Sequence, residues 1–346
     1  MNSYYRQTLE NVEVILSRTL PAEHLGDWAE LNAGCAITPV KDVSLLKINK
    51  PALDLLARGG KRWRPVLMCL ACELYDGGKR ALPFTPLVEF PHNGSLIVDD
   101  IEDKSDMRRG KPAVHITYGT DMAINTGNWI YFQPLVLLEI HDIEDELKLR
   151  LYKYYGEAMR RLHLGQGLDI GWHNEPDFYP EKGEYLQMCR FKTGSLARFS
   201  GQAGVALAGS SGEESDFFGG LMEKMGVAFQ ILDDVKNLTT GNPGKNRGDD
   251  IVEGKKSLPV IYFAAENPVE KSRLSELFKV AAEKGFDKGC DTIEEAIGMM
   301  VDAGVIDKAR NEAENMLNQV KEQLSGKFKS SQPLSAVIQM LDSFLS

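Results

Sequence analysis

The sequence contains no apolar run close to the roughly 18 residues that a membrane-spanning helix needs. Its first 21 residues lack the basic and then apolar segments of a signal peptide, so we expect an amphipathic helix there that ends at Pro21. Five cysteines in 346 residues are few and odd in number, which favours a reduced, cytoplasmic protein without a disulfide framework. Cys69 and Cys72 form a lone C-x-x-C in an apolar, helix-like context, which favours core packing over a zinc site.

An excess of positive charge is also absent. Lys and Arg number 40 against 50 Asp and Glu, which gives a net charge of −10. Such an acidic chain is a poor candidate for binding nucleic acid or an anionic membrane surface, although a local basic patch could still face an anionic small molecule. Hydrophobic residues at 43% and charged residues at 26% are typical of globular proteins and exclude disordered, collagen-like and coiled-coil classes.

Strict alternation of Val, Ile and Thr is hard to find, and internal repeats, low-complexity tracts and long linkers are missing. Apolar residues instead recur at three- and four-residue spacing, which predicts helices over residues 3–18, 66–76, 84–107, 120–140, 144–172, 183–208, 214–238, 256–266 and 307–325. Short joints rich in Gly, Pro and Asp separate them. We therefore predict an all-α fold, one large domain over residues 1–346, with helices packed around a deep central cavity.

The segment HNGSLIVDDIEDKSDMRRGKPAVH, residues 92–115, gathers carboxylates at one point of a predicted helix. Asp99 and Asp103 are i, i+4 neighbours, and Asp100 lies one step round the helix. Like charges this close repel one another unless a cation neutralises them, and hard oxygen ligands of this kind suit Mg²⁺ together with phosphate oxygens. A solvated acidic helix end is the alternative, which the basic residues at a fixed distance make less favourable.

Basic side chains follow directly and recur elsewhere in the chain. Arg108 and Arg109 offer planar donors that match phosphate. Three further stretches, RGGKRWRP, FKT and GKNRGDDIVEGKK, add Lys61, Arg62, Arg64, Lys192, Thr193, Lys245, Arg247 and Lys255. Each stretch alone is more often a solvated charge cluster, but together they provide more cations than one diphosphate needs, which indicates two diphosphate sites.

A second acidic pair lies in GVAFQILDDVKNL, where Asp233 and Asp234 occupy a predicted helix with Gln230 one turn before Asp234. A single pair of aspartates on a helix surface is common. Two acidic helix faces in one helical bundle nevertheless favour a facing arrangement in which metal ions bridge both through a diphosphate.

These motifs, in this order over about residues 55–265, resemble the trans-isoprenyl diphosphate synthase (polyprenyl synthetase) family. The segments that carry the resemblance are GGKRWRP, HNGSLIVDDIED with RRGKP, GQGLDI, KTG, FQILDD and DIVEGKKSLP. Residues 92–172 and 226–262 are most similar to geranylgeranyl diphosphate synthases of animals and fungi. The resemblance implies an isoprenoid synthase-like helical bundle, normally a homodimer. It also implies condensation of isopentenyl diphosphate with C5, C10 or C15 allylic diphosphates.

The resemblance also implies roles for single residues. The ligands of Mg²⁺ that it implies are Asp99, Asp100, Asp103, Asp233 and Asp234, with the last two opposite the first three. Three Mg²⁺ ions are implied, with Mn²⁺ as a substitute. It assigns to the allylic diphosphate Arg108, Lys192 and Lys255. It assigns to isopentenyl diphosphate Lys61, Arg64, His92 and Arg109. It assigns to the reaction centre or its closing loop Gln230, Thr193 and Lys245.

Small residues precede the first aspartate motif, and the resemblance connects them with product length. Gly94 and Ser95 let a growing tail pass, whereas farnesyl-length members carry an aromatic residue at one or both positions. Positions matching Tyr131, Phe132 and His163 form the floor in the type that the chain resembles, so we expect a C20 product. Tyr131 and Phe132 as ordinary core aromatics are the alternative.

Two residues depart from the common family pattern. Asn237 stands where many members carry a third aspartate, which we interpret as a mark of the geranylgeranyl type whose oxygen can still accept from a metal-bound water. Pro91 removes a helix hydrogen bond just before His92, and we expect a kink there.

Other functions are open at this point. Farnesyl or longer-chain synthases belong to the same class of enzyme. A class I terpene cyclase also uses DDxxD in a helical bundle, but GGKRWRP and RRG argue against it because a cyclase holds no isopentenyl diphosphate. A non-catalytic partner subunit typically has a degraded first aspartate motif, whereas DDIED is intact.

Overall fold

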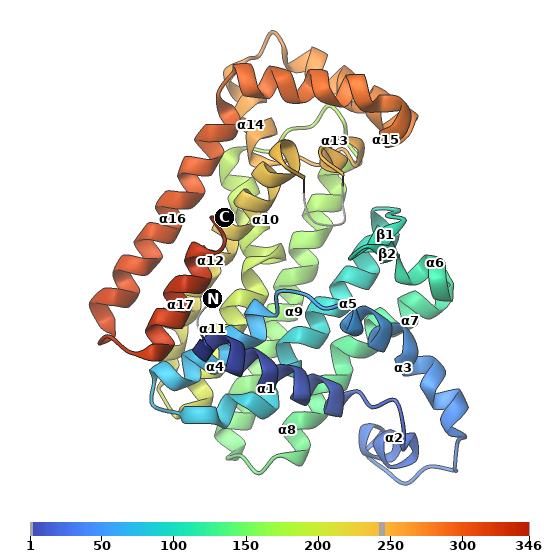
Figure 1. Cartoon of the computed structure of the whole chain (residues 1–346), viewed down its shortest axis with the longest axis vertical. Coiled ribbons are helices and arrows are strands. Elements are labelled where there is room, and N and C mark those ends of the chain that lie inside the picture. The colour runs from blue at the N-terminus through green and yellow to red at the C-terminus, as the bar shows by residue number, and fades with distance from the viewer. Residues whose placement is uncertain (1–2, 242–245, 346) are drawn as a thin grey trace. The chain divides into compact units, whose positions relative to one another are not determined.

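A computed structural model describes residues 3–241 and 246–345, and helices make up nearly all of its regular structure (Figure 1). The elements in chain order are α1 (Ser3–Thr19), α2 (Leu25–Ala33), α3 (Asp42–Ala57), α4 (Trp63–Leu74), η1 (Gly78–Phe84), α5 (Pro86–Glu102), β1 (Met107–Arg108), β2 (Lys111–Pro112), α6 (Val114–Tyr118), α7 (Thr120–Phe132), η2 (Gln133–Val136), α8 (Leu137–Ile140), α9 (Asp145–His173), α10 (Lys182–Lys192), α11 (Gly194–Leu207), α12 (Gly212–Thr239), α13 (Asp249–Val252), α14 (Leu258–Glu266), α15 (Lys271–Asp302), α16 (Val305–Lys327) and α17 (Gln332–Asp342). The antiparallel pair β1–β2 is the one sheet within the described residues. The predicted all-α fold is confirmed.

The chain divides into two compact units. Unit 1 comprises Met1–Gly156, Phe199–Gly219 and Ser330–Met340, and unit 2 comprises Glu157–Arg198, Gly220–Lys329 and Leu341–Ser346. Helices α9, α11, α12 and α17 each carry residues of both units. A single domain over the whole chain stays a prediction. Within the described ranges, no helix is long and apolar enough to cross a membrane.

The core of unit 1 is built around α4, whose residues from Trp63 to Cys72 are all buried. Gly204 of α11 lies against it so closely that a Cβ atom there would stand 2.3 Å from the carbonyl oxygen of Met68. Cys69 and Cys72 are free thiols within this core, and burial raises the pKa of both, that of Cys72 to about 11. The prediction that this C-x-x-C serves core packing is confirmed.

Helices α5 and α7 of unit 1 cross at a pair of glycines. A Cβ atom on Gly94 would lie 2.8 Å from the carbonyl oxygen of Gly127 and 2.9 Å from Cε1 of Tyr131. A Cβ atom on Gly127 would in turn lie 2.8 Å from Cγ2 of Val98. The absence of both Cβ atoms therefore lets α7 support the helix that ends in the first aspartate motif.

Two close approaches position the functional segments of unit 2. A Cβ atom on Gly165 of α9 would lie 2.2 Å from the backbone nitrogen of Lys192, so α9 touches the end of α10 directly. Gly248, with φ +82°, precedes α13 and would place a Cβ atom 2.4 Å from Cγ2 of Ile293 on α15. Helix α13 thus rests on α15.

Several predicted helix boundaries were wrong. The segment 84–107 ends as a helix at Glu102, because the hairpin β1–β2 follows, and 183–208 is two helices that meet at Thr193. Helices α2, α3, α15 and α17 were not predicted, and α15 is interrupted by Gly285 at φ +67°. Pro91 lies inside α5, and the kink expected there stays a prediction.

Candidate active site

The first aspartate motif occupies the last turn of α5, and its carboxylates differ in environment. Asp100 is fully buried, whereas the side chain of Asp99 is 18% exposed and Asp103, which follows the helix, is half-buried. Arg108 of β1 donates from Nε to Oδ1 of Asp100 over 2.8 Å, and its Nη2 lies 3.5 Å from Oδ2 of Asp99. Burial lowers the pKa of Arg108, but the bond and charge of Asp100 outweigh it and raise the pKa. Arg108 of the hairpin is therefore joined to the first aspartate motif.

The hairpin that carries Arg108 and Arg109 is held by a residue that the sequence analysis did not single out. Arg58, whose side chain is 1% exposed, donates from Nη1 to the carbonyl oxygens of Arg108 and Pro112 over 3.1 and 2.9 Å. Its Nη2 pairs with Asp54 one helical turn earlier, at 2.7 Å. Arg58 thereby fixes both strands of the hairpin to the end of α3.

A buried ion pair supports the basic segment before α4. Arg62 adopts left-handed backbone geometry at φ +46° and donates to Glu89 at 2.7 Å and to Glu13 at 2.9 Å. The side chains of Arg62 and Glu89 are 1% and 2% exposed. Asn93 donates to the same Oε1 of Glu89 and accepts from Arg109 at 3.3 Å, so the network leads from α1 to the hairpin.

Three of the four residues that the resemblance assigns to isopentenyl diphosphate gather around this network. Nη1 of Arg64 lies 3.5 Å from Nε2 of His92, and Arg109 donates to the carbonyl oxygen of Leu55 at 3.1 Å. Burial, followed by the charges of the surrounding arginines, holds the pKa of His92 well below its usual range. The same two causes lower the pKa of Arg109 to about 10. Lys61, the fourth residue, has an exposed side chain.

The clustered guanidinium groups repel one another in a region with little solvent, and an anion would relieve this repulsion. The charges that lower the pKa of His92 belong to Arg62, Arg64, Arg108 and Arg109. A planar guanidinium fork matches phosphate oxygens, and a neutral imidazole can accept or donate beside it. This part of unit 1 is therefore suited to bind a diphosphate.

In unit 2 the second aspartate pair divides into a buried and an exposed member. Asp234 accepts hydrogen bonds at both carboxylate oxygens, from Gln230 at 3.0 Å and from Tyr185 at 2.6 Å, and also from the backbone N–H of Leu258 at 3.3 Å. Burial raises the pKa of Asp234 to about 6, although these bonds act in the opposite direction. Asp233 is exposed. Asp234 therefore joins α12 to α10 and to the start of α14, while Asp233 is accessible to solvent.

The other predicted residues of unit 2 follow the same pattern of local pairing. The hydroxyl of Thr193 donates to Oε1 of Gln230 at 2.6 Å, which extends the chain of hydrogen bonds from Asp234. The ammonium of Lys192 donates to Oδ2 of Asp169 at 2.5 Å. Asp169, from the GQGLDI segment, therefore holds the side chain that the resemblance assigns to the allylic diphosphate.

The loop after α12 carries the remaining basic residues. Lys255 pairs with Glu253 and lies 4.0 Å from Oδ1 of Asp250. Asn237 is fully buried and its Oδ1 accepts from the backbone N–H of Asp250 at 3.4 Å, so in this structure it anchors the loop. Lys245 lies outside the described residues.

Of the residues expected to set product length, Gly94, Ser95 and Tyr131 lie together. Tyr131 is 6% exposed, and its ring fills the space beside Gly94. Ser95 is half-buried and donates from its hydroxyl to the carbonyl oxygen of His92 at 2.8 Å. The close packing of α5 on α7 therefore requires a small residue at Gly94, in addition to the expected passage of the product tail.

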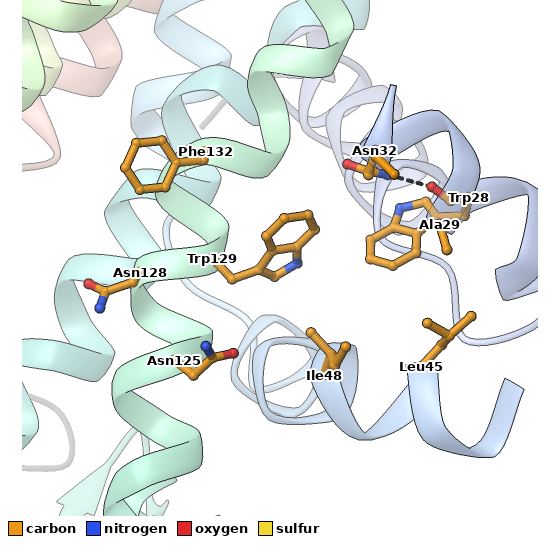
Figure 2. A pocket seen from close by; sticks show the side chains of 10 residues that line it. Trp28, Ala29, Asn32, Leu45, Ile48, Asn125, Asn128, Trp129 and Phe132 are labelled. Atoms are coloured by element: carbon orange, nitrogen blue, oxygen red, sulfur yellow. Dashed lines mark hydrogen bonds between the residues drawn. The ribbon is translucent and has the colours of Figure 1, made fainter. Parts of the chain in front are cut away.

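Phe132 has a different environment from Tyr131. It is 66% exposed and lines a separate pocket of about 420 Å³ between α7, α2 and α3, which Figure 2 shows with Trp28 and Trp129 on its walls. His163 in unit 2 is exposed, with Nδ1 2.8 Å from the carbonyl oxygen of Met159. Of the three residues expected to form the floor, Tyr131 is therefore buried, whereas Phe132 and His163 are exposed.

Four residues that were not expected from the sequence hold the predicted ones: Arg58, Glu89, Asp169 and Tyr185. Glu89 lies ten residues before Asp99 on the same helix, and Arg58 and Asp169 stand inside the segments RGGKRWRP and GQGLDI, so their positions carried a signal. Tyr185 carries no such signal, because its partner Asp234 comes from another segment of the chain.

Within the ranges that the structure describes, no group of three or more His, Cys, Asp or Glu side chains is arranged to hold a metal ion. The chemistry of the donors still fits Mg²⁺. Asp99 and Asp103 in unit 1 and Asp233 in unit 2 present hard carboxylate oxygens on partly or fully exposed side chains. Asp100 and Asp234 are already engaged by Arg108 and by Tyr185 and Gln230.

Comparison with known proteins identifies relatives across most of the chain. The family model described as "Polyprenyl synthetase" matches residues 46–295. A geranylfarnesyl diphosphate synthase of Aeropyrum pernix is 31% identical over 288 residues, 81% of this chain and 87% of the relative. A geranylgeranyl pyrophosphate synthase of Eremothecium gossypii is 36% identical over 225 residues, 62% and 68% of the two chains. The crystal structure of geranylgeranyl pyrophosphate synthetase from Pyrococcus horikoshii matches with a TM-score of 0.78 and 28% identity, over 96% of this chain and 98% of the other.

The helical fold, the acidic helix end and the clustered guanidinium groups, together with these relatives, define the class of the protein as a prenyltransferase. The chain belongs to the polyprenyl synthetase family, and its activity is that of a trans-prenyltransferase.

Proposed function

We propose that the protein condenses isopentenyl diphosphate with allylic diphosphates, head to tail, to all-trans geranylgeranyl diphosphate. The observation that carries this proposal is the desolvated guanidinium cluster around His92, next to the acidic end of α5. A cluster of this kind can bind an anion in addition to one held at the aspartates, as a second diphosphate requires.

We assign separate sets of basic residues to the two substrates. The isopentenyl diphosphate is assigned to Arg64, His92 and Arg109, with Lys61 at the exposed edge of the same segment. The allylic diphosphate is assigned to Arg108, Lys192 and Lys255. Each of these last three is now paired with a carboxylate, and a diphosphate would replace that partner.

The reaction follows from these assignments. The allylic C–O bond breaks and its diphosphate departs, while Arg108, Lys192 and Lys255 stabilise the charge that develops on it. The double bond of isopentenyl diphosphate attacks the allylic carbon, and the released diphosphate accepts the proton that is then lost. Gln230 and Thr193 are neutral, so they can lie beside a carbocation without capturing it.

We propose Mg²⁺ as the metal, three ions with Mn²⁺ as a substitute, held by Asp99, Asp103 and Asp233. When bound, the metal supplies Lewis-acid neutralisation of the departing diphosphate. Asp100 and Asp234 join them only where a metal competes with the hydrogen bonds that they now accept.

The C20 length is supported by the packing around the end of α5. Gly94 and Ser95 are small, and Tyr131 closes the space beside them. The names of the relatives include geranylgeranyl and geranylfarnesyl diphosphate, so family membership by itself leaves product length open.

Product analysis by mass spectrometry tests the proposal. Purified protein is given Mg²⁺, isopentenyl diphosphate and in turn a C5, C10 or C15 allylic diphosphate. We expect a C20 product that is lost in Asp99→Ala and kept in Asp121→Ala, which removes an exposed aspartate at the start of α7. A C15 or a longer product contradicts the length assignment and leaves the class in place.

The same assay separates the other classes of protein. Consumption of an allylic diphosphate without isopentenyl diphosphate, with release of a hydrocarbon, would indicate a terpene cyclase. Binding of diphosphates without any condensation would indicate a non-catalytic partner subunit.

We further propose a cytoplasmic homodimer. Ile124 and Phe132 on α7 and Leu164 and Leu168 on α9 are large apolar side chains with 38–66% of their surface exposed, and exposed apolar groups of this kind mark association surfaces. Light scattering after gel filtration measures the oligomeric state, and a monomeric mass at micromolar concentration would contradict it.

A further inference from the structure

Lys256, the second lysine of the EGKK segment, is buried although it carries a charge. Only 2% of its surface is exposed. Its ammonium donates to the carbonyl oxygen of Pro176 at 3.1 Å and lies 4.8 Å from the ring centroid of Tyr179 and 5.6 Å from that of Phe278. Two aromatic faces and one carbonyl thus stabilise a desolvated cation.

The residues around this ammonium belong to separate segments of unit 2. Pro176 and Tyr179 lie in the joint between α9 and α10, and Phe278 lies on α15. The hydroxyl of Tyr179 is 2.9 Å from Oγ of Ser275, and Lys271 lies 4.5 Å from the centroid of the same ring. The side chain of Lys256 therefore ties its own segment to two others.

Asp177, the acidic group whose charge raises the pKa of Lys256, is already paired with another lysine. Asp177 is close enough to influence the charge of Lys256, but both carboxylate oxygens of Asp177 are bound by Lys279 at 2.8 and 2.9 Å. The attachment of Lys256 consequently depends on the aromatic rings and on the carbonyl of Pro176.

Lys256 is one peptide bond away from Lys255, which we assign to the allylic diphosphate. Two residues further on, the backbone N–H of Leu258 donates to Oδ2 of Asp234 at 3.3 Å. The segment between α13 and α14 is therefore fixed at Lys256 and again at Leu258. Because consecutive Cα atoms are about 3.8 Å apart, fixing Lys256 also fixes the point from which the Lys255 side chain starts.

The chain just before α13 is attached to α15 as well. Arg247 pairs with Glu294 of α15 and donates to the carbonyl oxygen of Leu238 at 3.1 Å. Gly248 packs directly on Ile293. Helix α15, in which the sequence showed no motif, thus contacts the chain both before α13 and after it.

We propose that Lys256 is a positioning residue, which locks the segment between α13 and α14 so that Lys255 is held ready for the allylic diphosphate. The inference rests on the proposed function, because it needs Lys255 to contact that substrate. Lys256 itself touches neither substrate. The aromatic residues Tyr179 and Phe278 act through it.

Steady-state kinetics of Lys256→Met test this role. Methionine fills the buried site with an apolar chain of similar length, so we expect the unfolding temperature to stay within a few degrees of the wild type. The KM for the allylic diphosphate should rise about tenfold with the loss of a desolvated cation–π contact, while the KM for isopentenyl diphosphate stays unchanged.

Lys271→Met is the matched control. It removes an ammonium from the same Tyr179 ring, but Lys271 lies on α15 and has no covalent link to Lys255. We expect it to keep the wild-type KM for both substrates. An equal rise of the allylic KM in this variant would contradict the positioning role of Lys256.

Two further variants keep the test decisive if Lys256→Met does not fold. Phe278→Leu should raise the allylic KM in the same direction, and Lys256→Arg, which keeps the charge, should restore most of the wild-type value. An unchanged allylic KM in Phe278→Leu, or equal changes for both substrates, would overturn the inference.

The outcomes also separate this inference from the proposed function. If the wild type forms no prenyl product from any starter, the proposed function fails. If the wild type forms product and folded Lys256→Met keeps the wild-type allylic KM, only the role of Lys256 is contradicted.

Discussion

The buried hydroxyl of Tyr185 on α10 donates a hydrogen bond of 2.6 Å to Oδ2 of Asp234 on α12. Burial raises the pKa of Asp234 to about 6, and the bond from Tyr185 opposes this rise by stabilising the ionised carboxylate. Gln230 binds the other oxygen and is joined to Thr193 in turn. One tyrosine therefore orders three residues that we assign to the reaction.

Tyr185→Phe tests this relationship. We expect the free energy of unfolding in urea, at pH 7 without metal, to fall by about 1–3 kcal/mol because a buried carboxylate loses a donor. Tyr152→Phe is the control, since Tyr152 donates to Glu139 at the surface over 3.3 Å and should change stability by less than ~1 kcal/mol. Equal losses in the two variants would show that the buried bond has no special weight.

Gly94→Ala tests the contact between α5 and α7. The added methyl group would lie 2.8 Å from the carbonyl oxygen of Gly127, so we expect a loss of about 1–3 kcal/mol from overpacking. Gly26→Ala on α2 has no atom within 4 Å of the new methyl group and should be neutral or stabilising by up to ~1 kcal/mol. Urea unfolding of both variants measures the difference, and a stable Gly94→Ala protein would contradict the close crossing.

Separate substitutions of Tyr131 and Phe132 test what limits product length. Tyr131 is buried beside Gly94, so Tyr131→Ala should shift the products above C20. Phe132 lines the pocket between α7, α2 and α3 and is 66% exposed, so Phe132→Ala should leave the product length unchanged. Mass spectrometry of the products decides. Tyr131→Ala should also cost about 3–5 kcal/mol, so its folding is checked first.

Longer products from Phe132→Ala would place Phe132 in the floor after all. Unchanged products from both variants, and from the double variant, would remove the pair as the floor.

The stability difference between the wild type and Lys256→Met should depend on pH. Burial lowers the pKa of Lys256 to about 8 from its ordinary value of 10.5, Asp177 raises it, and Lys271 and Lys279 lower it. Below pH 8 both the folded and the unfolded chain keep the proton, so the cost of the buried charge is fully present.

Between pH 8 and 10.5 the folded chain releases this proton while the unfolded chain retains it, so stability rises with pH across this window. Across this window we expect the free energy of unfolding of the wild type to rise, relative to that of Lys256→Met, by at most about 3 kcal/mol. Urea unfolding of both proteins at pH 7, 8, 9 and 10 measures the gain. A constant difference would mean that Lys256 keeps its ordinary pKa. Burial raises the pKa of the neighbouring Tyr179 above its ordinary value.

The parts of the site that were predictable from sequence are those that depend on local spacing. Asp99, Asp100 and Asp103 lie together at the end of α5, as their spacing predicted. The hairpin that brings Arg108 within 3.5 Å of Asp99 was not predicted, because the periodicity indicated a helix through residue 107.

Contacts between distant segments were not predictable in the same way. Arg58 reaches the hairpin 50 residues later, and Phe278 reaches Lys256 from a helix with no readable motif. Helix α15 was also not predicted, and its helical periodicity is interrupted by non-helical backbone at Gly285.

The helical class, the order of the charged motifs and the family could be inferred from sequence alone, because periodicity and ordered motifs are properties of the chain. The three-dimensional packing was needed to show that Asp234 is bound at both oxygens while Asp233 is exposed, and that Tyr131 is buried while Phe132 is exposed. Neighbours of the same type in sequence differ in this way because burial depends on which face of the helix meets another segment. Packing between segments sets that face, and with it the pKa of the group and the partners that it can bind.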